Sequence, residues 1–333
     1  MAKMLPELKS ADCVKRYEHN PILSKKDIPY KADLIFNAGV VKHNEMYYML
    51  FRDDFIKSES NCLDLGTCVG VAKSSDGVHW QVRNKCIELN IDDKIGEIKR
   101  FYDPRLIVID DEFLVCFAVD TLHGVRGGIG KVVGDFEAID VLTLTTPDNR
   151  NLVLFPEKID GKYVRLERPF PVYSRGCDRF DIWISSSPDL KYWGENELLL
   201  GVEDVPYAND KIGPGAPPIK TDYGWLVIFH SVDVDHSRGK NGWEDIWQKR
   251  YCAGIMLLDL ENPKKVIGLC KTPLLAPELP YETDEGFRTN AIFPGSVIAE
   301  GDNVKIYYGA SDTVECLAEA KLSDLLKLCG VNM

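Results

Sequence analysis

A weak internal repeat limits the folds that this chain can adopt. The segments VAKSSDGVHW (71–80) and ISSSPDLKYWG (184–194) each begin with a strand-like run, continue through a Ser- or Pro-containing turn with Asp, and end near an aromatic residue. Similar segments surround Asp135, Asp259 and Asp324. Their spacing of about 55 to 70 residues is too long for a solenoid repeat and suits a four-stranded blade.

Counting these repeats predicts an all-β, five-bladed β-propeller. Short runs rich in Val, Ile, Tyr and Phe, separated by Gly, Asp, Asn and Pro, support the all-β class. The alternative is a pair of β-sandwiches with chance similarity between segments. We expect one catalytic domain over residues 1–333, with an N-terminal extension over about residues 1–20. The convincing helix is the C-terminal LSDLLKLC, with Ser323 as its expected N-cap.

Composition narrows the class of partner and the compartment. A chain of 333 residues buries a large core without disulfides or metals, and a net charge of −12 argues against nucleic acid and anionic membranes. No apolar run would span a bilayer, and residues 1–20 lack the apolar stretch of a secretory signal. The ten cysteines form no CxxC pair, so we expect reduced, buried thiols in a cytoplasmic protein and no metal site.

A propeller brings the loops at one end of its channel together, so each blade should supply one polar cluster after a strand. The chain offers such clusters at Asn37 with Arg52-Asp53-Asp54, at Tyr102-Asp103-Pro104-Arg105, at Asn149-Arg150-Asn151 with Arg168 and Asp181, at Lys211 with His230, and at Asp312.

Asp103 lies between an aromatic residue and a proline, just before the strand-like run RLIVID. Partial burial would raise the pKa of this carboxyl group and suit a general acid. A turn residue that hydrogen-bonds a hairpin is an equally good interpretation. The residues alone leave both open.

The cationic side chains Arg150, Arg168, Lys211 and His230 follow strands in an acidic protein, and together they indicate an anion site. Arginine forks and a lysine match phosphate oxygens well. Each residue taken singly would also serve as a surface ion-pair partner, although the apolar flanks of Arg168 and His230 argue against full solvation.

Two further segments would shape a pocket. KIGPGAPPI (211–219) is a rigid loop and lacks the Lys-Ser/Thr pair of a nucleotide-binding loop. Residues 235–250 read as an insertion over the pocket mouth, where Trp243 or Trp247 would stack on a sugar, or as an ordinary surface hairpin.

With these residues assembled, the sequence resembles glycoside hydrolase family 130, the β-mannoside phosphorylases and related mannosidases. The motifs that carry the resemblance follow the family's order and are FNAGVV, RDD, YDPRL, NRNLVLFP, GKYVRLERP, DIWISSSPDLKYWG, KIGPGAPPI, GWLVIFHSV, LLDLENP, and FP with IYYGASDT. The family fold is a five-bladed propeller, in agreement with the repeat count.

The resemblance implies roles for these residues. Asp103 matches the catalytic acid, which in that family acts through the O3 hydroxyl of mannose while phosphate attacks the anomeric carbon with inversion, giving α-mannose 1-phosphate. It assigns phosphate binding to Arg150, Asn151, Arg168, Lys211 and His230, and mannose binding to Asn37, Arg52, Asp53, Tyr102 and Asp312. We add Asp181 to the substrate-binding set from its place in the third cluster.

Phosphorolysis and hydrolysis differ in what they require of the pocket. Inverting hydrolysis needs a second carboxylate as base, whereas phosphate needs only positioning and charge neutralisation. The complete cationic set favours an inverting phosphorylase of the hexosyltransferase type, with phosphate as co-substrate and no cofactor.

The expected substrates are β-1,4-mannosides: mannooligosaccharides, or mannose linked to glucose or N-acetylglucosamine. The alternatives are a β-1,2-mannobiose or oligomannan phosphorylase, a β-mannosidase, and a non-catalytic sugar-binding propeller, which would need no phosphate site. A homo-oligomer is compatible with the sequence. Departures from the family pattern, such as FNAG for FNSA and FHS (229–231) for YHG, lie where the second sugar should bind and leave the linkage open.

Overall fold

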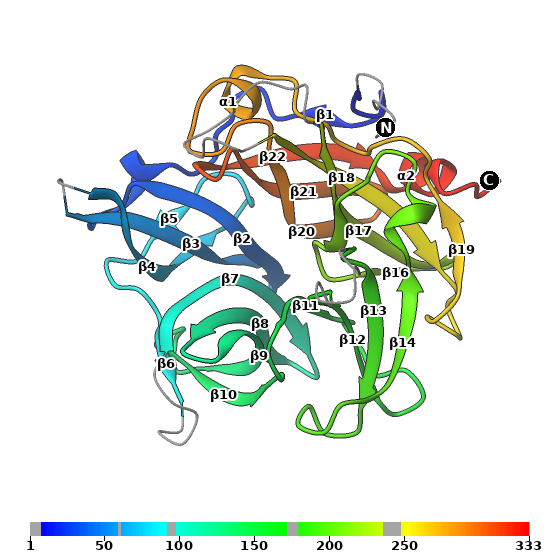
Figure 1. Cartoon of the computed structure of the whole chain (residues 1–333), viewed down its shortest axis with the longest axis horizontal. Helices are drawn as coiled ribbons and strands as arrows, with labels where there is room; N and C mark the ends of the chain where they lie inside the picture. Colours follow the sequence, from blue (N-terminus) through cyan, green and yellow to red (C-terminus); the bar gives the residue numbers. More distant parts are fainter. Residues whose placement is uncertain (1–7, 59–60, 92–97, 172–178, 236–247, 333) are drawn as a thin grey trace.

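The computed structural model describes residues 8–58, 61–91, 98–171, 179–235 and 248–332. Five antiparallel sheets, one of which carries an added parallel strand, are arranged around a central axis (Figure 1). The prediction of an all-β, five-bladed propeller with a short C-terminal helix is confirmed, and the sandwich alternative is excluded.

Each of the first two blades is a meander that begins at the central axis. The first contains β2 (Leu34–His43), β3 (Met46–Ser58), β4 (Asn61–Ser74) and β5 (Gln81–Val82). The second contains β7 (Ile98–Ile109), β8 (Glu112–Thr121), β9 (Gly124–Val133) and β10 (Ala138–Leu144), with β6 (Glu88–Asn90) added in parallel beside β10.

The other three blades follow the same plan. The third contains β11 (Asn149–Leu154), β12 (Tyr163–Pro169), β13 (Ile182–Ser187) and β14 (Gly194–Leu200). The fourth contains β15 (Lys211–Pro214), β16 (Ile219–Thr221), β17 (Gly224–Val234), β18 (Lys249–Leu258) and β19 (Val266–Leu269). The fifth contains β20 (Ile292–Glu300), β21 (Asn303–Ala310), β22 (Val314–Lys321) and, as its outer strand, β1 (Lys15–Arg16).

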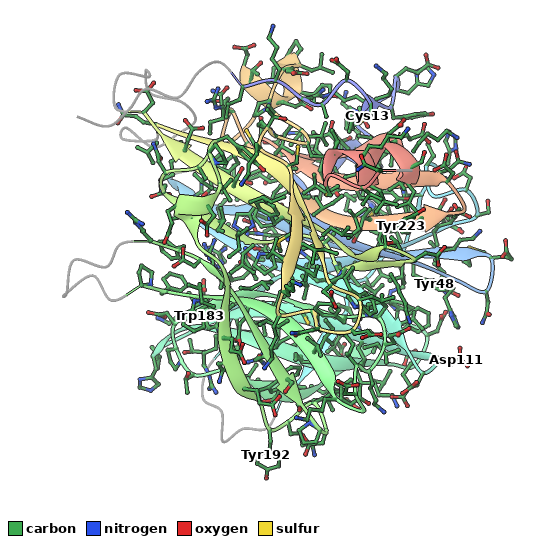
Figure 2. All side chains as sticks on the ribbon, turned by 90° about the vertical axis from the view of Figure 1, so that its right-hand side faces the viewer. Cys13, Tyr48, Asp111, Trp183, Tyr192 and Tyr223 are labelled. Carbon is green, nitrogen blue, oxygen red and sulfur yellow. A yellow bond between two sulfur atoms is a disulfide. The ribbon has the colours of Figure 1, made fainter. Side chains whose placement is uncertain are left out.

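The apolar core lies between adjacent blades, and side chains fill the spaces between the sheets (Figure 2). Strand β17 shows why its run Trp225–Phe229 is apolar without interruption. Trp225 and Val227 pack toward the third blade, whereas Leu226 and Ile228 pack toward the fifth. Successive side chains point to opposite faces, so a strand covered on both faces reads as a continuous apolar run.

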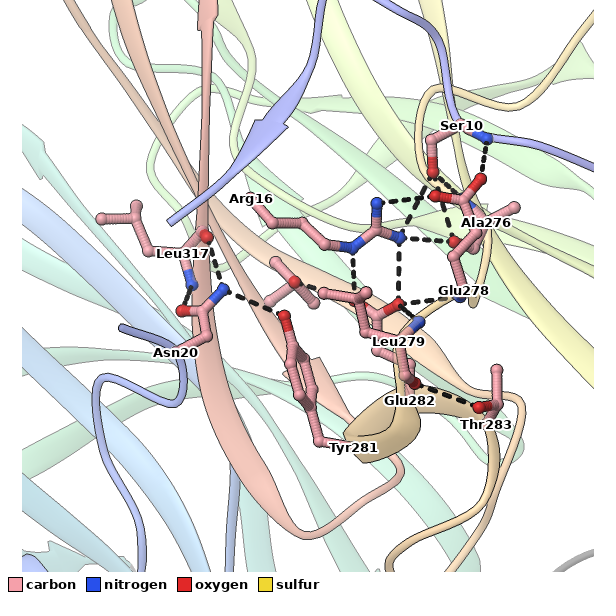
Figure 3. A network of polar contacts seen from close by, with 11 residues as sticks. Ser10, Arg16, Asn20, Ala276, Glu278, Leu279, Tyr281, Glu282, Thr283 and Leu317 are labelled. Atoms are coloured by element: carbon pink, nitrogen blue, oxygen red, sulfur yellow. Dashed lines mark hydrogen bonds and ion pairs between the residues drawn. The ribbon is translucent and has the colours of Figure 1, made fainter. Parts of the chain in front are cut away.

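The N-terminal segment closes the ring. Residues expected to form an extension supply β1, which pairs with β22 and so joins the two ends of the chain in one blade. Figure 3 shows the polar network around this closure. Glu282, 0% exposed in the helix α1 (Pro280–Thr283), accepts hydrogen bonds from Arg16 Nε at 2.8 Å, from Tyr308 Oη at 2.9 Å and from two backbone N–H groups.

The C-terminal helix is confirmed as α2 (Leu322–Leu328), but Ser323 as its N-cap is wrong. The cap position is Lys321, which makes no side-chain cap bond, and Ser323 lies inside the first turn. Its backbone N–H donates to Asp302 Oδ1 at 2.8 Å. A carboxylate from the β20–β21 turn therefore satisfies the helix terminus.

The expectation that all cysteines are reduced is also wrong, because the structure pairs Cys68 with Cys86. The backbone N–H of Ile87 donates to the carbonyl of Val69, which brings the two cysteines beside each other. The free thiols among the described side chains are Cys13, which is partly exposed, and the buried Cys116, Cys252, Cys270, Cys316 and Cys329. The side chains of Cys62 and Cys177 lie outside the described part.

Within the described ranges, no helix is long and apolar enough to cross a membrane. The same residues contain no cluster of three or more His, Cys, Asp or Glu side chains with the geometry to hold a metal ion.

The polar network around Glu282 predicts that removing two different carboxyl groups will lower the free energy of unfolding by unequal amounts. Glu282→Ala leaves Arg16 largely buried without this partner, and should lower the free energy of unfolding in a urea titration by about 3–5 kcal/mol. Asp135→Ala removes the exposed pair with Lys73 and should change it by less than about 1 kcal/mol. Equal losses would show that the network does not stabilise ring closure.

Candidate active site

Four of the five inner strands of the propeller carry a bulge. The strand register shifts between Phe36 and Gly39 in β2, Tyr102 and Arg105 in β7, Arg150 and Val153 in β11, and Pro294 and Ser296 in β20. Three of these bulges contain a left-handed polar residue: Asn37 (φ 55°), Asp103 (φ 54°) and Asn151 (φ 60°). Asn and Asp tolerate this conformation better than most residues, and a bulge re-aims the side chain that it carries.

Glycines let the neighbouring blades approach closely at these bulges. A Cβ on Gly295 would lie 2.1 Å from the carbonyl oxygen of Ala38, and one on Gly39 would lie 2.6 Å from the backbone nitrogen of Leu106. No larger residue fits without moving backbone. The close approach of these strands narrows the channel, and the pocket lies beside this constriction.

Arg105 occupies this constriction and is almost fully buried. Its Nε donates to the carbonyl of Gly215 at 2.8 Å, and its Nη1 donates to the carbonyls of Asn37 at 3.0 Å and Pro104 at 2.8 Å. The guanidinium also lies 5.2 Å from the ring centroid of Phe293. One side chain therefore ties together the first, second, fourth and fifth blades.

A polar pocket opens on these bulges and receives side chains from all five blades. Seven residues predicted as site residues line it: Asn37, Arg52, Asp103, Arg150, Asn151, Arg168 and Asp312. The sequence interpretation missed the other four, Tyr251, Arg288, Ala291 and Phe293.

Asp103 sits in the β7 bulge with its carboxylate in the pocket, and not in a hairpin turn. Its Oδ1 accepts from Asn37 Nδ2 at 3.0 Å and from Arg52 Nη1 at 3.2 Å. Burial alone would raise the pKa of this carboxyl group, but Arg52 and Arg105 outweigh burial and lower it. The expectation of a raised pKa is therefore wrong, and Asp103 is ionised in the free protein.

Arg52 is held rigidly beside Asp103. Asp54 accepts from its Nε at 3.0 Å and its Nη2 at 2.6 Å. The guanidinium lies 4.6 Å from the ring centroid of Phe36 and 4.8 Å from that of Tyr102. This two-point contact fixes the plane of the guanidinium and directs Nη1 at Asp103.

The buried Arg168 and Lys211 and the partly buried Arg150 form a cationic cluster. Arg168 and Lys211 are short of negative charge, whereas Tyr102 and Asp103 outweigh burial and raise the pKa of Arg150. Among the described residues, no carboxylate lies within 4.0 Å of Arg168, which is 2% exposed. Lys211 Nζ is 3.5 Å from Asp210, which also pairs with Lys249 at 3.1 Å.

The pKa values reflect this shortage. Burial and Arg150 lower the pKa of Arg168 to about 9, and burial and Arg168 lower the pKa of Lys211 to about 8. A bound anion would supply the missing charge.

His230 lies behind this cluster and does not line the pocket. Its Nδ1 is 3.1 Å from the carbonyl oxygen of Pro214, which can only accept, so Nδ1 carries the proton. Its Nε2 then accepts from Arg168 Nη1 at 3.1 Å. Burial and Arg168 lower the pKa of His230 well below its usual range, which is consistent with this neutral form.

Three other predicted residues lie outside the pocket lining. Asp53 points to the opposite face of β3 from Arg52, where burial and Asp54 raise its pKa to about 7. Tyr102 donates to Asp120 at 2.7 Å and supports Arg52 with its ring. Asp181 accepts from the backbone N–H of Val202 at 2.8 Å.

Lys211 is likewise not part of the lining, although it faces the same cluster as Arg168. Of the insertion expected over residues 235–250, the part 236–247 with Trp243 and Trp247 lies outside the described residues, and Lys249 and Arg250 begin β18.

Comparisons with known proteins identify the family of this chain. The model of glycoside hydrolase family 130, described as beta-1,4-mannooligosaccharide phosphorylase, matches residues 7–330. A beta-1,4-mannooligosaccharide phosphorylase from Ruminococcus albus is 32% identical over 96% of this chain and 92% of its own. A 1,2-beta-oligomannan phosphorylase from Thermoanaerobacter sp. is 30% identical over 94% of this chain and 98% of its own.

Relatives also include a beta-1,2-mannobiose phosphorylase from Listeria innocua, 33% identical over 78% of this chain and 67% of its own. Its solved structure with beta-1,2-mannobiose superposes with a TM-score of 0.78 and 26% identity, covering 96% of this chain and 99% of that chain. With a family model matched over nearly its whole length, this chain belongs to glycoside hydrolase family 130.

Proposed function

We propose that this protein is an inverting β-mannoside phosphorylase, which cleaves β-mannosides with inorganic phosphate and releases α-mannose 1-phosphate. The observation that carries the proposal is the cluster of Arg150, Arg168 and Lys211 beside the Asp103 carboxylate, in which Arg168 and Lys211 are buried and short of negative charge. The names of the relatives support the reaction class.

Phosphate fits this cluster by charge and by geometry. Its oxygens accept paired N–H donors from an arginine fork and the point charge of a lysine. We assign phosphate binding to Arg150, Arg168 and Lys211, with Asn151 as a neutral donor. His230, expected to bind phosphate, instead holds Arg168 in place through Nε2 in the free protein.

Asp103 is the proposed acid, and bound phosphate would favour its protonated form. The negative charge of phosphate offsets Arg52 and Arg150 and thereby raises the pKa of Asp103, so the carboxyl group gains its proton when the nucleophile is present. Asp103 then gives this proton to the O3 hydroxyl of mannose, which passes its own to the departing oxygen. Phosphate forms the new bond to the anomeric carbon as the glycosidic bond breaks.

The mannose would lie between Asp103 and the fifth blade. Arg288 Nη1 pairs with Asp312 at 3.2 Å, and burial raises the pKa of Asp312 even though Arg288 opposes the shift. We assign mannose binding to Asn37, Arg52 and Asp312, with Tyr102 supporting Arg52 from behind.

Hydrolysis is the competing reaction, because two carboxylates, Asp103 and Asp312, line the pocket. Inverting hydrolysis uses such a pair, one as acid and one as base. The cationic cluster has no task in that reaction, and we therefore favour phosphorolysis.

We propose β-1,4-mannosides as substrates and β-1,2-mannosides as the second candidate. The family model and the Ruminococcus albus relative favour the first, whereas the relatives from Listeria innocua and Thermoanaerobacter favour the second.

Both disaccharides, β-1,4- and β-1,2-mannobiose, should be incubated with the protein with and without inorganic phosphate. Mannose 1-phosphate should form from one of them only when phosphate is present. Free mannose at an equal rate without phosphate would establish hydrolysis. No turnover of either compound would favour a sugar-binding propeller.

Asp103→Asn should lower turnover by about 10²- to 10⁴-fold, because an amide cannot donate the proton. The matched control is Asp181→Asn, whose amide oxygen can still accept from Val202, and its turnover should stay near that of the unaltered protein. Initial rates of mannose 1-phosphate formation measure both. Retained activity in Asp103→Asn would remove Asp103 from the acid role.

Substitutions of two arginines on β12 test whether Arg168 lacks a negative partner in the free protein. Arg168→Met removes a buried cation without a carboxylate partner and should leave the free energy of unfolding unchanged, or raise it by about 1 kcal/mol or more, in phosphate-free buffer. Arg165→Met removes the ion-pair partner of the buried Glu167, which accepts from Arg165 at 2.9 Å. Among the described residues, Glu167 then keeps only the neutral donors Asn149 and Ser185, and the free energy of unfolding should fall by about 3–5 kcal/mol.

Urea titrations of both variants measure these changes. A loss in Arg168→Met as large as that in Arg165→Met would show that Arg168 is already compensated in the free protein.

A further inference from the structure

Glu315 is a buried carboxyl group that the proposed reaction does not use directly. It lies on β22, is 0% exposed and does not line the pocket. Its Oε2 accepts from the backbone N–H of Ala38 at 3.1 Å. Its Oε1 is also buried and has no hydrogen-bond partner among the described residues.

A second buried oxygen without a partner lies close by. Asn37 donates through Nδ2 to Asp103, but its Oδ1 makes no hydrogen bond within the described part of the chain. A buried acceptor left unpaired costs about 1–3 kcal/mol. Two such acceptors next to the proposed acid call for an explanation.

The two oxygens share one small space over Gly309. Glu315 is the cross-strand neighbour of Gly309 in the β21–β22 ladder, so the Glu315 side chain and a Cβ on Gly309 would point to the same face. Such a Cβ would lie 2.8 Å from Asn37 Oδ1. The other oxygen of Glu315 already contacts Ala38, the residue after Asn37, which places the Glu315 carboxyl group and the Asn37 amide on the same side of Gly309.

Two acceptors cannot bond to each other unless one carries a proton. We propose that Glu315 is a protonated carboxylic acid whose Oε1–H donates to Asn37 Oδ1, and that it thereby holds the Asn37 amide with Nδ2 directed at Asp103. This inference rests on the proposed function of the pocket. Without this donor, the amide can rotate by 180° and present its oxygen to the Asp103 carboxylate, which would repel it.

The surroundings of Glu315 favour the protonated form. Burial raises its pKa to about 8, against the opposing effects of the Ala38 N–H and the Arg105 guanidinium. Arg105 faces it from β7, and Cys316 is its titratable neighbour on β22. The residues that β2 and β21 present, Asn37, Ala38 and Gly309, do not titrate. Glu315 therefore keeps its proton below about pH 8 and loses it above.

The test compares Glu315→Gln with Glu315→Met at saturating phosphate, where the bound anion keeps Lys211 charged. In the unaltered protein, kcat should fall above about pH 8. Glu315→Gln still donates through its amide, so it should keep kcat within about 2-fold at pH 7 and lose the part of the alkaline decline centred near pH 8, leaving only the part that Asp103 itself gives. Glu315→Met donates nothing and should lower kcat by about 10-fold. The exposed Glu319→Gln on the same strand is the matched control and should leave the profile unchanged.

An alkaline decline that persists unchanged in Glu315→Gln would overturn the inference. Infrared spectroscopy gives a readout that does not depend on turnover: at pH 7 the carbonyl band of protonated carboxyl groups should contain a component from Glu315 beside that of Asp53, and the Glu315 component should be lost in Glu315→Gln. Absence of this component from the unaltered protein would overturn the protonated state. Absence of phosphate-dependent turnover with the Glu315 component present would contradict the proposed function and leave Glu315 protonated.

Discussion

The hydrogen bonds of the Arg105 guanidinium are the contacts on which the pocket depends. The inner strands approach so closely at the channel that glycine is required at Gly39 and Gly295, and backbone carbonyls turn toward the axis. Arg105 satisfies three of these carbonyls, one of which belongs to Asn37. Asn37 and Asp103 have a left-handed backbone conformation in their bulges, and their side chains form a hydrogen bond in the pocket. The backbone geometry of the channel therefore sets the position of the proposed acid.

The pocket gathers positive charge, although the molecule as a whole is negatively charged. The chain carries a net charge of −12, yet Arg150, Arg168 and Lys211 are gathered where burial lowers the pKa of Arg168 and of Lys211. Such an arrangement lowers stability in the free protein and is typical of a site completed by its ligand. The ionised state of Asp103 comes mainly from Arg52 and Arg105, and Arg150, which faces the anion site, adds to it. Phosphate would therefore change both halves of the site when it binds.

The sequence predicted the architecture and most of the pocket because both follow from local patterns. Repeated strand–turn segments indicated five blades, and the polar residues after inner strands supplied seven pocket residues. Asp53 could have been excluded by strand alternation, since Arg52 and Asp54 share one face of β3 and Asp53 takes the other. Tyr251, Arg288 and Phe293 carry no local signal, because only the folded chain brings them to the pocket. The pKa of Asp103 depends on how many cations surround it, which is a tertiary property that no motif encodes.

The central claim is that the cationic cluster is completed by phosphate, and calorimetric titration of the free protein with inorganic phosphate tests it most directly. At pH 8 about half of the Lys211 side chains are unprotonated, and phosphate should raise their pKa again. Titrations in two buffers with different protonation enthalpies should therefore show one phosphate bound per chain, with uptake of about half a proton by Lys211 and up to one more by Asp103. Arg168→Met should lose this binding. Binding without proton uptake, or no binding at all, would contradict the account.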